Sequence, residues 1–153
     1  NGAGLRGIGG TAASLTEGEI DSLVRGGVTP LESLGGVTSP IRGITTKTKT
    51  GGAADASWRE ITTILIVDDV IPTLRESLGA KFLRSKNTAR NRGAIRAQVI
   101  VELERKREAE IIEGYGEVTA RASEDDPTVC EVEFPFAVAH GLNQIYLTAH
   151  ITV

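Results

Sequence analysis

Two hydrophobic periods run through this chain and divide it into helical and extended segments. Apolar residues that recur every three to four positions predict helices, at residues 15–25, 64–83 and 88–113. Strict alternation and β-branched residues predict strands, at 28–34, 41–48, 118–122, 130–136 and 145–153. This order predicts an α+β fold, with two long helices packed on one face of a mixed, largely antiparallel sheet.

Pro72 complicates the second helical segment. It either kinks one long helix or lies in the first turn of a new helix that is capped near Asp68 or Asp69. We therefore interpret these two carboxylates as capping groups, and we predict an extended or irregular entry at residues 58–63 before the helix. Gly114 is expected to end the third helical segment.

Composition favours one packed domain that begins inside a longer protein. The 153 residues are 40% hydrophobic and 24% charged, which suits a single folded domain. Because no methionine occurs, even at position 1, we expect the chain to start within a longer parent. Residues 1–14 are rich in glycine and are interpreted as the end of a preceding region, and residues 15–153 as the domain itself.

The sequence offers no catalytic, cofactor-binding or metal-binding set. His140 lies at a predicted turn and His150 on the polar face of a predicted strand, while Cys130 alternates inward with apolar neighbours. No HExxH or CxxC spacing occurs, and the GxGxxG string at residues 2–7 follows no strand. The acidic turn at 124–126 lacks the spacing of a calcium loop. No apolar run reaches the ~18 residues that a membrane span needs. We therefore expect neither an enzyme nor a membrane partner.

One charged segment differs from the rest of a chain whose net charge is -3. No acidic residue occurs between positions 77 and 101, and this segment carries six basic residues: Lys81, Arg84, Lys86, Arg90, Arg92 and Arg96. This segregation predicts a basic face across a helix–loop–helix corner. Three interpretations stay open: a solvated face, contact with an acidic protein surface, and a nucleic-acid-binding module. The lack of interleaved aromatic residues disfavours the last of these.

The alternating segment at 145–153 reaches the last residue without a capping turn, a proline or a charged tail. Its residues are Ile145, Tyr146, Leu147, Thr148, Ala149, His150, Ile151, Thr152 and Val153. A strand of this kind either lies inside a sheet or pairs with another chain, because an uncovered edge is open to pairing.

The order and spacing of several short stretches resemble the C-terminal core domain of contractile tail sheath proteins of bacteriophages and related particles. The stretches are LTEGEIDSL at 15–23, GVTPL at 27–31, ITT at 44–46, WREI at 58–61, VDDVI at 67–71 and LNQ at 142–144. No single stretch is specific. The likeness covers residues 15–153.

This resemblance implies a structural subunit of a sheath that polymerises around a rigid tube and contracts to drive the tube through a target envelope. Such a subunit has no catalytic residues and no cofactor. Its implied partners are neighbouring sheath subunits and the tail tube protein, in a virion or contractile particle assembled in the bacterial cytoplasm. Residues 145–153 match the arm strand that joins a neighbour's sheet, and the six basic residues become candidates for contact with the tube. Because the arm that normally precedes this region is absent, we expect the isolated chain to be a monomer or a strand-exchanged dimer.

Overall fold

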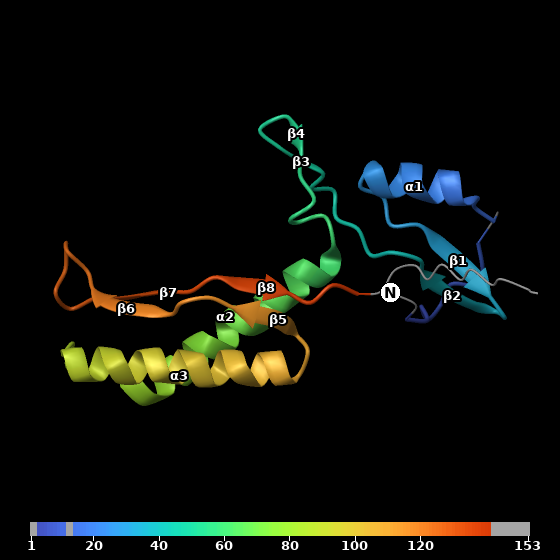
Figure 1. Cartoon of the computed structure of the whole chain (residues 1–153). Helices are drawn as coiled ribbons and strands as arrows, with labels where there is room; N and C mark the ends of the chain where they lie inside the picture. The colour runs from blue at the N-terminus through green and yellow to red at the C-terminus, as the bar shows by residue number, and fades with distance from the viewer. Residues whose placement is uncertain (1–2, 12–13, 142–153) are drawn as a thin grey trace, which may run out of the picture. The chain divides into compact units, whose positions relative to one another are not determined.

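The computed structural model describes residues 3–11 and 14–141 (Figure 1). In chain order the elements are α1 (Glu17–Arg25), β1 (Leu31–Leu34), β2 (Val37–Pro40), β3 (Lys49–Thr50), β4 (Ala53–Ala54), α2 (Ile61–Phe82), α3 (Ala89–Glu108), β5 (Ile112–Tyr115), β6 (Thr119–Ala122), β7 (Cys130–Glu133) and β8 (Phe136–Val138). They form two compact units: the described residues up to Thr63 with His140 and Gly141, and Ile64–Ala139. The predicted α+β class is confirmed, and all four strand pairs are antiparallel.

Helix α1 of the first unit begins at a reciprocal cap. The Glu19 backbone N–H donates to the Thr16 hydroxyl over 3.4 Å, and the Thr16 backbone N–H donates to the Glu19 carboxylate over 2.8 Å. These bonds satisfy two amide groups that have no partner inside the helix. The helix ends before Gly26, so its predicted extent is confirmed.

The prediction of a strand at residues 41–48 of the first unit is wrong. Strand β2 begins three residues after β1 ends, because Gly35 and Gly36 have positive φ angles of 59° and 81° and close a tight hairpin turn. Ile44 makes only an isolated bridge to Glu60. Its backbone N–H and C=O instead bond the Thr29 hydroxyl, at 2.9 and 3.0 Å, which removes the need for a strand partner.

Helix α2 runs unbroken through Pro72, so the interpretation of Asp68 and Asp69 as caps of a new helix is wrong. Both carboxylates lie in the interior of the helix. The Thr73 hydroxyl donates to the Asp69 carbonyl oxygen over 2.6 Å, which supplies an additional hydrogen bond next to the proline. The irregular entry predicted before this helix is present, although the helix itself starts at Ile61, earlier than expected.

Helix α3 begins as predicted but ends early. The Thr88 hydroxyl caps it by accepting the Asn91 N–H over 3.2 Å. Glu110 then adopts a left-handed φ of 56°, and the Ile111 N–H donates back to the Lys106 carbonyl over 2.9 Å. This turn reverses the chain, so Gly114 lies inside β5 instead of ending the helix.

A long two-stranded ribbon follows α3. β5 pairs with β8 and β6 pairs with β7, and the Gly116 N–H donates to the Pro135 carbonyl over 2.9 Å between the two pairs. A Cβ atom on residue 116 would lie 2.7 Å from Cγ of Pro135, so only glycine fits this point without displacing the proline ring. Within the described residues, each pair consists of two strands only.

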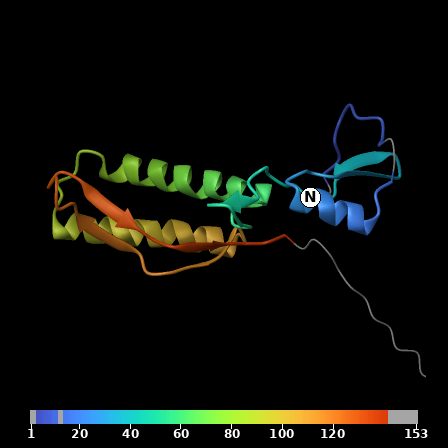
Figure 2. The same ribbon diagram turned by 90° about the horizontal axis from the view of Figure 1, so that it is seen from above.

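The core of the second unit lies between the two long helices and this ribbon (Figure 2). Its buried members are aliphatic: Ile66, Val70 and Leu74 from α2, Val99 and Leu103 from α3, and Ile112 and Val118 from the ribbon. Half-buried residues of the other ribbon strand, from Val132 to Val138, pack against them. The helices therefore cover one face of the ribbon, as predicted.

Candidate functional site

The six basic residues singled out in the sequence occupy the last turn of α2, the connecting loop and the first half of α3. We call this region the basic corner: Lys81, Arg84, Lys86, Arg90, Arg92 and Arg96. Among the residues that the structure describes, none of the six forms an ion pair. Their positive charge is therefore not neutralised by direct carboxylate contacts in this part of the chain.

Two arginines of the basic corner are nevertheless tied to the fold by hydrogen bonds. The Arg96 Nε–H donates to the Val118 carbonyl over 2.7 Å and so links α3 to the segment before β6. Arg92 donates to the carbonyl and the side-chain oxygen of Asn87, at 3.2 and 3.1 Å. We conclude that these two guanidinium groups have a structural role in addition to their charge.

The remaining charge is concentrated on Arg84, Lys86 and Arg90, which are exposed. Arg84 adopts a positive φ of 72° at the end of α2, where the chain leaves the helix. An ion pair at this site would be exposed and would contribute little by itself, so three together suit a weak, orienting contact.

The basic corner lies beside the turn between β6 and β7. The Asn87 side-chain amide donates to the carbonyl oxygens of Pro127 and Val129, over 2.8 and 3.0 Å. Within that turn Thr128 donates twice to the Asp126 carboxylate, from its hydroxyl over 2.6 Å and its N–H over 2.8 Å. These hydrogen bonds lower the pKa of Asp126. The acidic turn is thus held by hydrogen bonds between its own residues and from Asn87.

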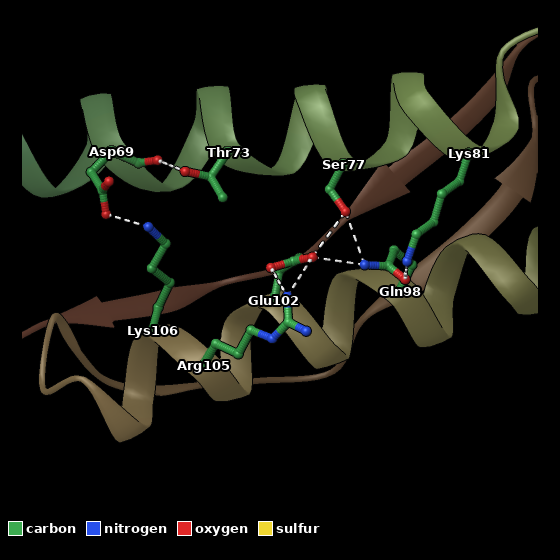
Figure 3. A network of polar contacts seen from close by, with 8 residues as sticks. All are labelled: Asp69, Thr73, Ser77, Lys81, Gln98, Glu102, Arg105 and Lys106. Carbon is green, nitrogen blue, oxygen red and sulfur yellow. Dashed lines mark hydrogen bonds and ion pairs between the residues drawn. The ribbon is translucent and has the colours of Figure 1, made fainter.

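Sequence reasoning missed a network of polar side chains between α2 and α3, which we call the polar seam (Figure 3). Its members are Asp69, Ser77 and Lys81 of α2 and Gln98, Glu102, Arg105 and Lys106 of α3. A signal for it exists in the sequence: polar residues recur every four positions along α2, at Asp69, Thr73, Ser77 and Lys81.

Glu102 is the centre of the polar seam and is 8% exposed. Its carboxylate accepts from the Ser77 hydroxyl over 2.9 Å and from the Gln98 amide over 2.7 Å, and Arg105 donates to it as well. Burial alone would raise the pKa of Glu102, but the hydrogen bonds from these side chains, with the charge of Arg105, outweigh it. The pKa is therefore lowered from its ordinary value.

The structure does not bring together the other residues that the sequence analysis considered as catalytic or metal-binding candidates. Cys130 is half-buried in β7, and burial raises the pKa of its thiol, which disfavours a reactive thiolate. His140 is exposed beyond β8. Across residues 3–11 and 14–141, no three His, Cys, Asp or Glu side chains gather as they would around a metal ion. In the same residues no helix is both long and apolar enough to cross a membrane. The predicted strand at 145–153, with His150, lies outside the described residues.

Comparisons with known proteins bear on the family and the fold of this chain. The family model for the phage tail sheath C-terminal domain matches residues 53–152. A chain in the anti-feeding prophage baseplate has a similar fold, with a TM-score of 0.67 and 13% identity over 99% of this chain and 44% of that one. The sheath tail protein from Desulfitobacterium hafniense has a TM-score of 0.64 and 13% identity over 88% of this chain and 35% of its own. This chain thus spans less than half the length of either. No curated protein matches it, and none of these findings supports nucleic-acid binding.

Proposed function

Because this chain belongs to the phage tail sheath C-terminal domain family, we propose that it is a structural part of a contractile sheath that polymerises around a rigid tube. In this proposal the sheath shortens and drives the tube through a target envelope, and the chain performs no catalysis. Its partners are neighbouring copies and the tube protein, in a virion or contractile particle assembled in the bacterial cytoplasm.

The observation that carries this proposal is the two-stranded ribbon of the second unit. Its strands pair only with each other in the described residues, so each strand has one edge without a partner strand there. Unpaired edges favour the addition of a strand from another chain. Residues 145–153 have the alternating pattern of such a strand and are our candidate for the link between subunits.

The basic corner is our candidate for contact with the tube. Its six residues form no ion pair with the described acidic residues, and Arg84, Lys86 and Arg90 are exposed. Such a contact orients subunits through complementary charge and is weak enough to break when the sheath contracts. The alternative use of these charges, binding of nucleic-acid phosphates, has no second observation in its favour.

Electron microscopy tests the link between subunits. The parent protein, produced with its tube protein, is expected to form hollow cylinders, and a parent with Leu147→Pro and Ile151→Pro is expected to form none. Proline removes the backbone N–H groups that a strand must donate. The matched control, Thr148→Ser with Thr152→Ser, keeps every N–H and is expected to form cylinders. Dispersed particles from the unaltered parent contradict the sheath function, and cylinders from the proline variant contradict the role of the strand.

Charge reversal tests the contact with the tube. Arg84→Glu, Lys86→Glu and Arg90→Glu together are expected to reduce assembly on purified tubes at least about tenfold at low salt, with a smaller difference at high salt. The control reverses three exposed cations elsewhere, Arg25, Lys49 and Arg75, and changes the net charge equally. Pelleting of tubes with bound sheath protein measures the effect. Equal losses in both variants would show a general effect of charge, and no loss in either removes the basic corner from the contact.

A further inference from the structure

The ribbon has a hollow at its middle, where the residues that face away from the helices are small. We call it the glycine hollow, and it is lined by Gly114, Tyr115, Gly116, Pro135, Phe136 and Ala137. Its volume is about 410 Å³, within the range of about 300–1,000 Å³ that holds a small ligand. The rings of Tyr115 and Phe136 pack against the core, whereas Pro135 and Ala137 alternate with core-facing residues and are exposed. The glycine hollow therefore opens on the outer face of the ribbon.

The fold explains one of the two glycines in the hollow but not the other. Gly116 has to be glycine because of Pro135, as described above. A Cβ atom on residue 114, in contrast, would have no neighbour within 4 Å, and Gly114 does not have a positive φ. A glycine inside a strand weakens the strand, often marks a close approach by another group, and is stabilised when an aromatic ring covers it. No side chain of the described residues covers Gly114 in this way.

Carboxylates border the glycine hollow. Glu113 precedes Gly114 and Glu117 follows Gly116, and both are exposed. Neither forms an ion pair with a described residue. A group that fills the hollow therefore fits best if it is aromatic and has positive charge beside it.

The first unit presents a side chain of this kind. Trp58 is the only tryptophan of the chain and is 44% exposed. Its carbonyl oxygen accepts the Thr45 hydroxyl over 2.7 Å, and the Lys47 N–H donates to the same hydroxyl oxygen over 3.1 Å. Lys47 and Lys49 are exposed, and neither forms an ion pair with a described residue. The exposed indole is thus anchored through its backbone to a segment that carries two exposed lysines.

Resting on the proposed function, we propose that the Trp58 indole of one copy covers the glycine hollow of a second copy, with Lys47 and Lys49 against the carboxylates at its border. An assembly of identical chains supplies both surfaces and brings them together at high local concentration. Because the donor and the acceptor are different surfaces of the chain, the contact is head to tail, and it can continue into an open helical series. Tryptophan is also enriched among the residues that contribute most to the affinity of protein interfaces.

Fluorescence of the single tryptophan tests this contact in the full 153-residue chain. The Gly114→Val chain has a blocked hollow but keeps Trp58 as the donor, whereas the Trp58→Ala chain keeps the hollow and has no tryptophan emission. When the Trp58→Ala chain is added to the Gly114→Val chain, the tryptophan emission is expected to move to shorter wavelength and to saturate, because the indole leaves water. The titration curve gives the dissociation constant of the contact.

The matched titrant carries both Trp58→Ala and Gly114→Val, so it differs from the first titrant only in its blocked hollow. It is expected to bind at least about thirtyfold more weakly. Ala137→Glu in place of Gly114→Val blocks the hollow at a second, exposed residue and is expected to act in the same way.

Charge variants of the Trp58→Ala titrant test the border of the hollow. Glu113→Lys with Glu117→Lys is expected to weaken binding about tenfold at low salt, with a smaller loss at high salt. The control, Glu124→Lys with Asp125→Lys, has the same net charge but lies in the turn between β6 and β7. It is expected to bind as the Trp58→Ala chain does.

Three results overturn the inference. The first is the absence of a shift up to millimolar titrant, and the second is an equal shift with the matched titrant. The third is an emission of the highly diluted, unaltered chain that already equals the saturated value, because Trp58 is then covered within its own chain. Circular dichroism confirms that each variant is folded, and Gly114→Val is expected to keep the fold because its Cβ atom enters open space.

The same experiment separates this inference from the proposed function. If the parent forms cylinders with its tube protein but the titration gives no shift, the inference fails and the proposed function stands. If the unaltered parent forms no cylinders, the proposed function fails whatever the titration gives.

Discussion

Replacing Leu103 by alanine is expected to lower the free energy of unfolding of the second unit by about 3 kcal/mol. The side chain is fully buried at the centre of the core, between α2, α3 and the ribbon. The substitution removes apolar contacts and leaves a cavity that the surrounding aliphatic side chains fill only in part. Urea-induced unfolding monitored by circular dichroism measures the change in the free energy of unfolding.

The matched control is Leu83→Ala, because Leu83 is 76% exposed just after α2. The same atoms are removed there with no cavity, so we expect a change within about 0.5 kcal/mol. Similar effects at the two leucines would contradict the position of Leu103 in the core and with it the packing of the helices under the ribbon.

Replacing Glu102 by alanine is expected to cost about 2 kcal/mol, because the Ser77 hydroxyl and the Gln98 amide lose their shared acceptor while they remain partly buried. Glu108→Ala on the same helix is the control. Its side chain is exposed at the C-terminal end of α3, where a negative charge is unfavourable, so a small gain or no change is expected.

The lowered pKa of Glu102 also predicts how the free energy of unfolding changes with pH. Because the folded protein binds this proton less readily than the unfolded chain, Glu102 contributes its full stabilisation above its ordinary pKa of 4.5 and loses it as the pH falls below that value. Glu19, Asp55 and Asp126 have lowered pKa values as well and act in the same direction. We therefore compare the unaltered chain with Glu102→Gln. The difference in unfolding free energy between the two is expected to shrink from pH 7 to pH 3, and a constant difference would contradict the role of this carboxylate.

Local signals in the sequence predicted the parts of the fold that local contacts determine. Thr16 and Glu19 form the cap of α1 within four residues of each other, and Thr88 caps α3 in a similar way. The sequence did not predict the end of α3 correctly because Glu110, and not a glycine, adopts the left-handed conformation that ends the helix. Helix α2 continues through Pro72 because tertiary packing on one face of the helix outweighs the lost hydrogen bond.

The sequence predicted the basic corner as a charged region, but it did not predict which of its residues form hydrogen bonds within the fold. The six basic residues lie within 16 positions of the sequence, and so their gathering at one corner follows from the helix–loop–helix pattern alone. The structural role of Arg96 depends on a tertiary partner, the Val118 carbonyl 22 residues away, which no local pattern indicates. The polar seam likewise joins residues such as Ser77 and Glu102, 25 positions apart, and no local pattern pairs them.

The polar seam has a mechanical consequence. Apolar side chains packed between two helices already oppose sliding, and hydrogen bonds and ion pairs add partners with a preferred length and direction. A slip of α2 along α3 by one turn, about 5.4 Å, would break the bonds of Ser77 and Lys81 and the ion pair of Asp69 with Lys106 together. The polar seam therefore fixes the register of α2 along α3, and we expect the two helices to move as one rigid pair when a force acts on either.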